Sequence, residues 1–148
     1  MTHRIQEACG ARVAAWMKEL FGAKLSTLEE GRGHRVRFGS AWVDVSVSAW
    51  GEAEAVITAS APVVSGATLG LDLMAYLLRK NCETRFGAFG VSEAGDIELR
   101  YSLVGSTAQR EELRASVQYL MLAADLCDDE IVARWGGRRA ADGGKAKA

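Results

Sequence analysis

HRVRFGSAWVDVSVSAWGEAEAVITASA, residues 34–61, decides the fold, because apolar and polar residues alternate along almost all of it. A period of two places successive side chains on opposite faces of a β-strand. Gly39-Ser40 and Trp50-Gly51 interrupt the alternation, and Gly-Ser is typical of a tight hairpin turn. The stretch therefore predicts three antiparallel strands that share one aliphatic face, which includes Val43, Val45, Ile57 and Ala59.

Apolar residues recur with helical spacing on both sides of these strands. The spacing predicts amphipathic helices over residues 4–21, from Thr68 to about residue 81, and from Ser106 to about residue 135. Thr68 is the expected N-cap of the second helix. Ser106, with Gln109 three positions later, is the expected capping box of the third.

Two shorter runs, 86–91 and 97–103, predict further strands, so the element order is α-β-β-β-α-β-β-α. The connections within each block are too short for parallel strands, so an antiparallel sheet is expected. Pro62 closes the first block, and residues 24–28 form either an edge strand or a lead-in. The pattern predicts one two-layer α+β domain over residues 1–135, with a twisted antiparallel sheet.

The segment 136–148, GGRRAADGGKAKA, contains no large apolar residue and is expected to be a disordered tail. It carries a charge of +3 within a chain whose net charge is −1, a balance that argues against a nucleic-acid partner. Weak contact between the tail and RNA or an acidic partner is the alternative to a merely solvated tail. No apolar run approaches the roughly 20 residues of a membrane span, and the first residues resemble no secretory signal. We therefore expect a cytoplasmic protein without a membrane partner.

The residue types that catalysis and metal binding require are few and scattered. His3 and His34 have no partner at helical or hairpin spacing. Cys9, Cys82 and Cys127 lie on the apolar sides of three helices, where a free thiol packs as a small hydrophobe. We expect no enzymatic activity, no metal and no cofactor.

Four acidic residues, Asp125, Asp128, Asp129 and Glu130, gather late in the third helix. A solvated polar face is the first interpretation of such a cluster. A metal site is less favoured, because calcium sites usually draw their oxygens from a loop. A docking patch for a basic segment is the intermediate interpretation.

The polar face of the second strand carries two tryptophans among small polar residues. Large aromatic rings are enriched at binding surfaces. This face therefore predicts a groove for an apolar or amphipathic peptide, to which the next strand contributes one more residue. Packing of the rings beneath a loop or terminus is the competing interpretation. The candidate peptide-binding residues are Trp42, Asp44, Ser46, Trp50 and Val56.

The third helix is apolar on more than one face, which indicates burial on more than one side. In a domain of this size we expect the additional face to be the interface of a two-fold homodimer, with a centrally buried helix of a monomer as the alternative. The second helix competes for the same role. The candidate interface residues are Leu71, Met74, Leu78, Tyr119, Leu122 and Leu126.

Several segments of the second half resemble the YbjN-type family of bacterial proteins, which shares its fold with the class I type III secretion chaperones. They are YLLRKN (76–81), FGAFGV (86–91), EAGD (93–96), IELRY (97–101), AADLCDDE (123–130) and RWGG (134–137). The resemblance covers the first half only in element order. It implies an α+β domain that dimerises and binds protein segments, and it implies no catalytic residues.

The leading functional hypothesis is therefore a non-enzymatic, chaperone-like domain that binds a protein or peptide segment as a homodimer. A regulatory or scaffold subunit of a larger bacterial assembly is the second hypothesis. A small-molecule sensor, or an enzyme that uses the acidic cluster, is the third. Because one fold hosts many functions, a role in secretion does not follow from the shared fold.

Overall fold

The structure is a computed structural model that describes residues 2–28, 33–39 and 41–142. Within them, seven strands form a single sheet in the order β1-β2-β3-β4-β6-β5, and β7 pairs with β4. Every strand pair is antiparallel, as the sequence predicted. The strands are β1 (Leu25–Thr27), β2 (His34–Phe38), β3 (Ala41–Trp50), β4 (Glu54–Ser65), β5 (Ala88–Val91), β6 (Ile97–Val104) and β7 (Arg138–Arg139).

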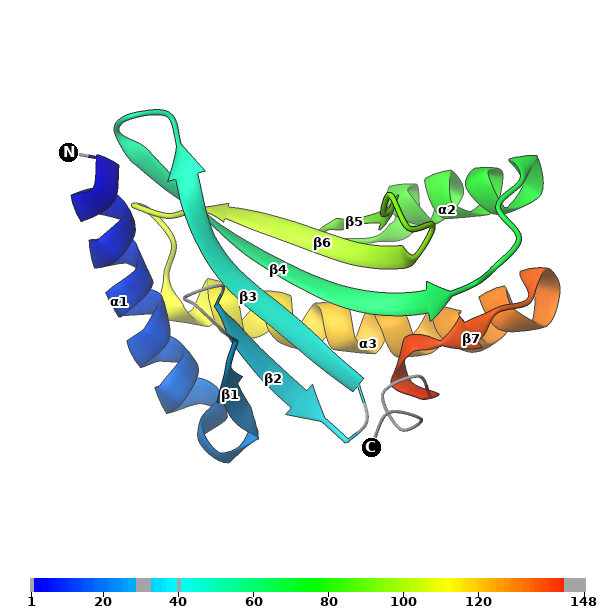
Figure 1. The fold of residues 1–148 in the computed structure, drawn as a ribbon, viewed down its shortest axis with the longest axis horizontal. Coiled ribbons are helices and arrows are strands. Elements are labelled where there is room, and N and C mark those ends of the chain that lie inside the picture. Colours follow the sequence, from blue (N-terminus) through cyan, green and yellow to red (C-terminus); the bar gives the residue numbers. More distant parts are fainter. Residues whose placement is uncertain (1, 29–32, 40, 143–148) are drawn as a thin grey trace.

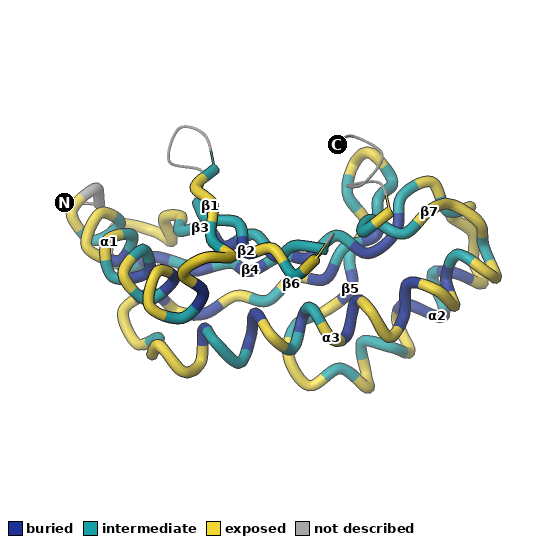
Figure 2. Tube along the Cα trace, turned by 90° about the horizontal axis from the view of Figure 1, so that it is seen from below, coloured by how far each residue is buried: buried dark blue, intermediate teal, exposed yellow. Residues whose placement is uncertain are grey.

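The helices are α1 (Thr2–Phe21), the short 3₁₀ helix η1 (Gly22–Lys24), α2 (Leu71–Glu83) and α3 (Arg110–Trp135). Long α3 runs along the sheet, with α1 at one end of the molecule and α2 at the other (Figure 1). Figure 2 shows α2 and α3 together on one side of the sheet, with buried positions along the α3 face that meets it. The architecture is therefore the predicted two-layer α+β arrangement.

The core lies between the helices and the aliphatic face of the sheet. Val13 and Met17 of α1 and Leu120 of α3 are buried there with Val45 and Ile57 of the central strands. These residues are the ones that the alternation of period two and the helical spacing placed on apolar faces. The sheet is thus buried on one face, as is common for an antiparallel sheet.

Four details differ from the sequence prediction, and the first concerns Pro62. β4 continues through Pro62 to Ser65, with a shift of register against β6 between Pro62 and Val64. A proline is tolerated in a strand at such an irregularity, because no ladder bond there requires its missing N–H.

Two predicted helix caps are also displaced. Gly70, not Thr68, precedes α2, and no side chain caps that helix. The capping box of α3 is formed by Gln109 and Glu112, three residues after the predicted pair. Ser106 instead binds Glu54 through its hydroxyl and its backbone N–H. The carboxylate of Glu54 therefore competes successfully for the predicted capping residue.

The fourth difference lies at the C-terminus, where a disordered tail was predicted from Gly136. Arg138 and Arg139 pair with Ser65 and Val64 of β4, and Arg139 also binds Asp142 and Asp129. The ordered chain therefore continues past Trp135, because backbone pairing and ion pairs replace the apolar burial that this segment lacks. The rest of the predicted tail, residues 143–148, lies outside the described residues.

Candidate functional site

The sheet face opposite α1 and α3, here called the outer sheet face, consists of side chains in register across four strands. Arg35, Asp44, Ser60 and Arg100 form one row across β2, β3, β4 and β6. The next rows are Ser46, Thr58 and Ser102, and then Ser48, Val56 and Val104. These side chains are half-buried or exposed. The alternation of β3 places Trp42, Asp44, Ser46 and Trp50 on this face, and the pairing of Ser48 with Val56 adds Val56 of β4 to it.

An ion pair holds the Trp42 end of this face. Arg35 donates to both carboxylate oxygens of Asp44, at 2.7 and 2.9 Å, and this hydrogen bonding raises the pKa of the guanidinium. The same guanidinium lies 4.8 Å from the centre of the Trp42 ring, and that of Arg37 lies 6.0 Å from it. Paired and stacked charges of this kind orient an aromatic ring. Trp42 is therefore half-buried, and its ring is held in one orientation by the two arginines.

The other end of the outer sheet face is apolar and open. Trp50 has 61% of its surface exposed, and Val104 is also exposed. With Val56, Ser102 and Leu103 they line a hollow of about 370 Å³. Exposed tryptophan is uncommon on a surface that makes no contacts, and clustered apolar side chains mark interaction sites.

The two tryptophans lie at opposite ends of the outer sheet face, and each lines a separate hollow. They are eight residues apart on one strand, a separation of about 26 Å at the usual rise of a strand. The rows between them carry small polar residues, such as Ser46 and the hydrogen-bonded pair of Thr58 and Ser102. The outer sheet face therefore has two apolar ends joined by a polar middle.

A second hollow opens at the Trp42 end, where β3 separates from β4. β3 pairs with β4 up to Ser60, and β7 pairs with the same edge at Val64. In the described part of the chain, no strand pairs with this edge of β4 between Ser60 and Val64. A hollow of about 250 Å³, here called the β4-edge pocket, opens at this gap. Its walls are mainly apolar and include Phe38, Trp42, Pro62, Val63, Met121 and Leu122.

The acidic cluster divides among several environments instead of forming the single solvated face that was expected. Asp125 is exposed and lines the β4-edge pocket, whereas Asp128 lines the same pocket but is buried. Asp129 pairs with Arg139. Glu130 accepts a hydrogen bond from the Tyr76 hydroxyl.

Burial raises the pKa of the Asp128 carboxyl, and its acidic neighbours add to the rise. The sequence did contain a signal for this burial. Asp128 follows the buried residues Leu120 and Ala124 at intervals of four, so it continues the stripe of α3 that faces the sheet.

The predicted dimer residues fall into two groups. Leu71 and Leu78 on α2 and Leu122 and Leu126 on α3 are strongly exposed, Leu71 to 89% and Leu126 to 80%. Tyr119 is instead engaged within the chain, because its hydroxyl accepts a hydrogen bond from the Arg85 backbone N–H and its ring packs on Phe86.

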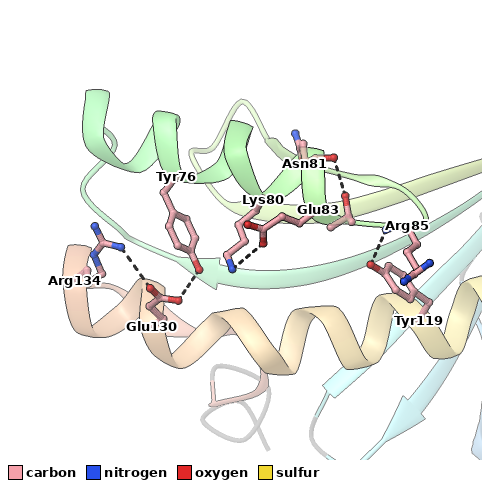
Figure 3. A network of polar contacts seen from close by, with 9 residues as sticks. Tyr76, Lys80, Asn81, Glu83, Arg85, Tyr119, Glu130 and Arg134 are labelled. Carbon is pink, nitrogen blue, oxygen red and sulfur yellow. Dashed lines mark hydrogen bonds and ion pairs between the residues drawn. The ribbon is translucent and has the colours of Figure 1, made fainter.

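Figure 3 shows this contact together with the Tyr76–Glu130 hydrogen bond, so α2 and the loop after it are held to α3 at two points. Met74 of α2 is half-buried. The apolar surfaces on the two helices are therefore held in fixed relation to each other.

Other site chemistries find little support in the described residues. These residues contain no group of three or more His, Cys, Asp or Glu side chains placed to hold a metal. None of their helices has the length and apolarity needed to cross a bilayer. Cys9 and Cys127 are buried as predicted, whereas Cys82 is exposed on α2.

Comparison with known protein families gives one match over residues 7–143, almost the whole described chain. The matching family is described as T3SS (YopN, CesT) and YbjN peptide-binding chaperone 1. The chain belongs to this family. The predicted resemblance to YbjN-type proteins and to type III secretion chaperones is thereby confirmed.

The chain is also similar to a solved structure, that of the ExsC–ExsE complex. The TM-score is 0.64 at 22% identity, and the match covers 82% of this chain and 95% of the other. At that identity the similarity shows a common fold. No curated protein sequence matches the chain significantly.

Proposed function

We propose that this chain is a non-catalytic chaperone that binds an extended segment of another protein on its outer sheet face and acts as a homodimer. The observation that carries the proposal is the uncovered sheet face with the exposed Trp50 and Val104 at one end. Membership of a peptide-binding chaperone family supports the same class of partner. The free thiols suit the reducing cytoplasm in which we expect the protein to work.

The proposed binding mode follows from the arrangement of the face. An extended peptide crossing it would bury apolar side chains at the two ends and place polar groups over the serine and threonine rows between them. Burial around a central aromatic ring usually supplies most of the binding free energy of such a contact. We therefore assign Trp50, Val56 and Trp42 as anchor contacts, and Asp44 and Ser46 as polar contacts.

Selection from a random-peptide library displayed on phage tests this proposal. Selected peptides are labelled, and their dissociation constants are measured by fluorescence anisotropy on the full chain. We expect Trp50→Ala to weaken binding about 30-fold, because an aromatic anchor contributes about 2 kcal/mol.

The matched control is Leu126→Ala, which removes an exposed apolar side chain from α3 and is expected to leave peptide affinity unchanged. Circular dichroism establishes that both variants are folded. Equal affinity for the wild type and Trp50→Ala would remove the outer sheet face from the proposal. Failure to select any peptide would reject peptide binding as the function.

The alternative function, a scaffold subunit, is favoured by one observation. Leu122 and Leu126 form an exposed apolar pair one turn apart on α3, and Leu126 does not line the β4-edge pocket. A scaffold that joins an assembly through this pair tolerates Trp50→Ala but loses its partner when Leu126 becomes polar. Comparison of Trp50→Ala with Leu126→Glu therefore separates the two functions.

A further inference from the structure

Asp128 is the only charged side chain that is buried in the described part of the chain, with 6% of its surface exposed. Its Oδ1 atom is shielded from solvent and has no hydrogen-bond partner there. A buried carboxylate with one oxygen left without a partner destabilises the folded state, because the protein replaces only part of the hydration that the group loses. A ligand that supplies the counter-charge would remove this penalty.

The surroundings of Asp128 define which ligand fits. The β4-edge pocket contains two carboxylates, those of Asp125 and Asp128, and no basic residue among the described residues that line it. The cation whose charge acts most directly on Asp128, Arg139, is bound to Asp129 and Asp142. The pocket is therefore an apolar-walled hollow whose polar groups are acidic.

We propose that the β4-edge pocket binds a lysine or arginine side chain of the protein segment that this chaperone carries, pairing its cationic head with Asp128. The inference rests on the proposed peptide-binding function and adds a chemical specificity to it. The alkyl stem of the basic side chain lies against the apolar walls formed by Trp42, Pro62 and Met121. Asp125, at the exposed side of the pocket, attracts the same charge.

A long basic side chain fits this pocket better than a metal ion or a small cation does. Lys and Arg combine an apolar stem with a charged tip, which matches an apolar wall that leads to a buried acid. A divalent cation prefers six or more oxygen ligands, and the pocket offers two carboxylates. The gap between β3 and β7 also places the pocket at the end of the outer sheet face, on the proposed path of the peptide.

A double-mutant cycle tests the pairing. Peptides selected on the wild type are resynthesised with each Lys or Arg replaced in turn by norleucine, which keeps the apolar stem and removes the charge. Their affinities are measured for the wild type and for Asp128→Asn. At one position in the peptide, we expect the replacement to weaken binding to the wild type about 10-fold to 100-fold. The same replacement should leave the affinity for Asp128→Asn nearly unchanged, because the charged partner is already absent.

Two controls accompany the cycle. Asp72→Asn removes a carboxylate of the same type from exposed α2, and we expect it to behave as the wild type in every comparison. A chain that ends at Asp142 is expected to show the same coupling, because the pairing involves the peptide. Thermal unfolding verifies that Asp128→Asn remains folded.

The outcomes separate this inference from the function on which it rests. In one outcome, the norleucine replacement weakens binding equally for the wild type and for Asp128→Asn. This outcome would overturn the pairing and leave peptide binding intact. Selection of peptides that contain no basic residue would also overturn the pairing and leave peptide binding intact. If no peptide binds the wild type, the proposed function fails and the inference fails with it.

Discussion

At the scale of single residues, burial decides what each acid on α3 does. Asp128 and Asp129 are neighbours in the chain, yet Asp128 is buried without a partner for its Oδ1 among the described residues, and Asp129 is paired with Arg139. The first arrangement destabilises the fold and the second contributes little, because exposed ion pairs are weak. A residue kept at a cost to stability is the kind that binding sites contain.

The cost at Asp128 has a defined dependence on pH. Burial raises the pKa of its carboxyl, and the charges of Asp129 and Asp125 add to the rise, while a hydrogen bond from the Asp129 backbone and the charge of Arg139 oppose it. The folded chain therefore holds this proton to a higher pH than the unfolded chain does, and unfolding releases it between the two pKa values. Since the folded state binds more protons in that interval, stability falls as the pH rises through it.

We predict that Asp128→Asn unfolds at a higher temperature than the wild type at neutral pH. The expected gain is about 1 kcal/mol, or about 3 °C, because the amide carries no charge to desolvate. The difference should vanish under acidic conditions, where Asp128 is protonated in both states. Differential scanning calorimetry over a series of pH values measures it, and a wild type that is the more stable at neutral pH would show that Asp128 already has a cationic partner.

At the scale of elements, competition for a side chain decides where α3 begins. Glu112 accepts a hydrogen bond from the Gln109 backbone N–H, and Gln109 caps the helix in return. Ser106 is unavailable because its hydroxyl and backbone N–H bind Glu54 at the start of β4. The helix therefore begins at Arg110, where its first backbone donors find partners.

We predict that Glu112→Ala lowers the free energy of unfolding by about 1 kcal/mol, the usual loss for a broken helix cap. Glu111→Ala is the matched control, because Glu111 lies in the same turn and makes ion pairs with Arg110 and Arg114. Its loss should be smaller. Urea denaturation of the three proteins compares them, and equal losses would mean that the first-turn charge matters and the capping box does not.

At the scale of the whole molecule, exposed leucines on α2 and α3 are the candidates for the interface of the proposed homodimer. Leu71, Met74 and Leu78 follow one another at three and four residues along α2, so they form a continuous apolar stripe. Leu122 and Leu126 on α3 are flanked by the polar residues Gln118 and Asp129 at the same spacing. We therefore place the proposed two-fold interface on α2.

We predict that the double variant Leu71→Glu/Leu78→Glu is monomeric, because like charges would meet across a two-fold axis. Multi-angle light scattering gives the mass directly. Leu122→Glu/Leu126→Glu is the control, and we expect it to keep the mass of a dimer. A wild type with the mass of one chain would remove the homodimer from the proposal.

How far the sequence predicts this molecule depends on the range of the interactions involved. The alternation over residues 34–61 and the helical stripes predicted the antiparallel sheet, the three long helices and the faces they bury, because period and polarity are local properties. They also placed Trp42 and Trp50 on one face. The motifs of the second half indicated the family, which comparison then confirmed.

Contacts between segments that are distant in the chain could not be predicted from the local sequence pattern. The capture of Ser106 by Glu54, the pairing of Arg139 with β4, and the gap between β3 and β7 all depend on which elements meet in space. The same holds for Asp128, since only the packing of α3 against the sheet removes its carboxylate from water. The amino-acid order by itself determined the elements and their apolar faces, while tertiary structure decided the caps, the pocket and its buried charge, because these depend on desolvation and on partners far away in the chain.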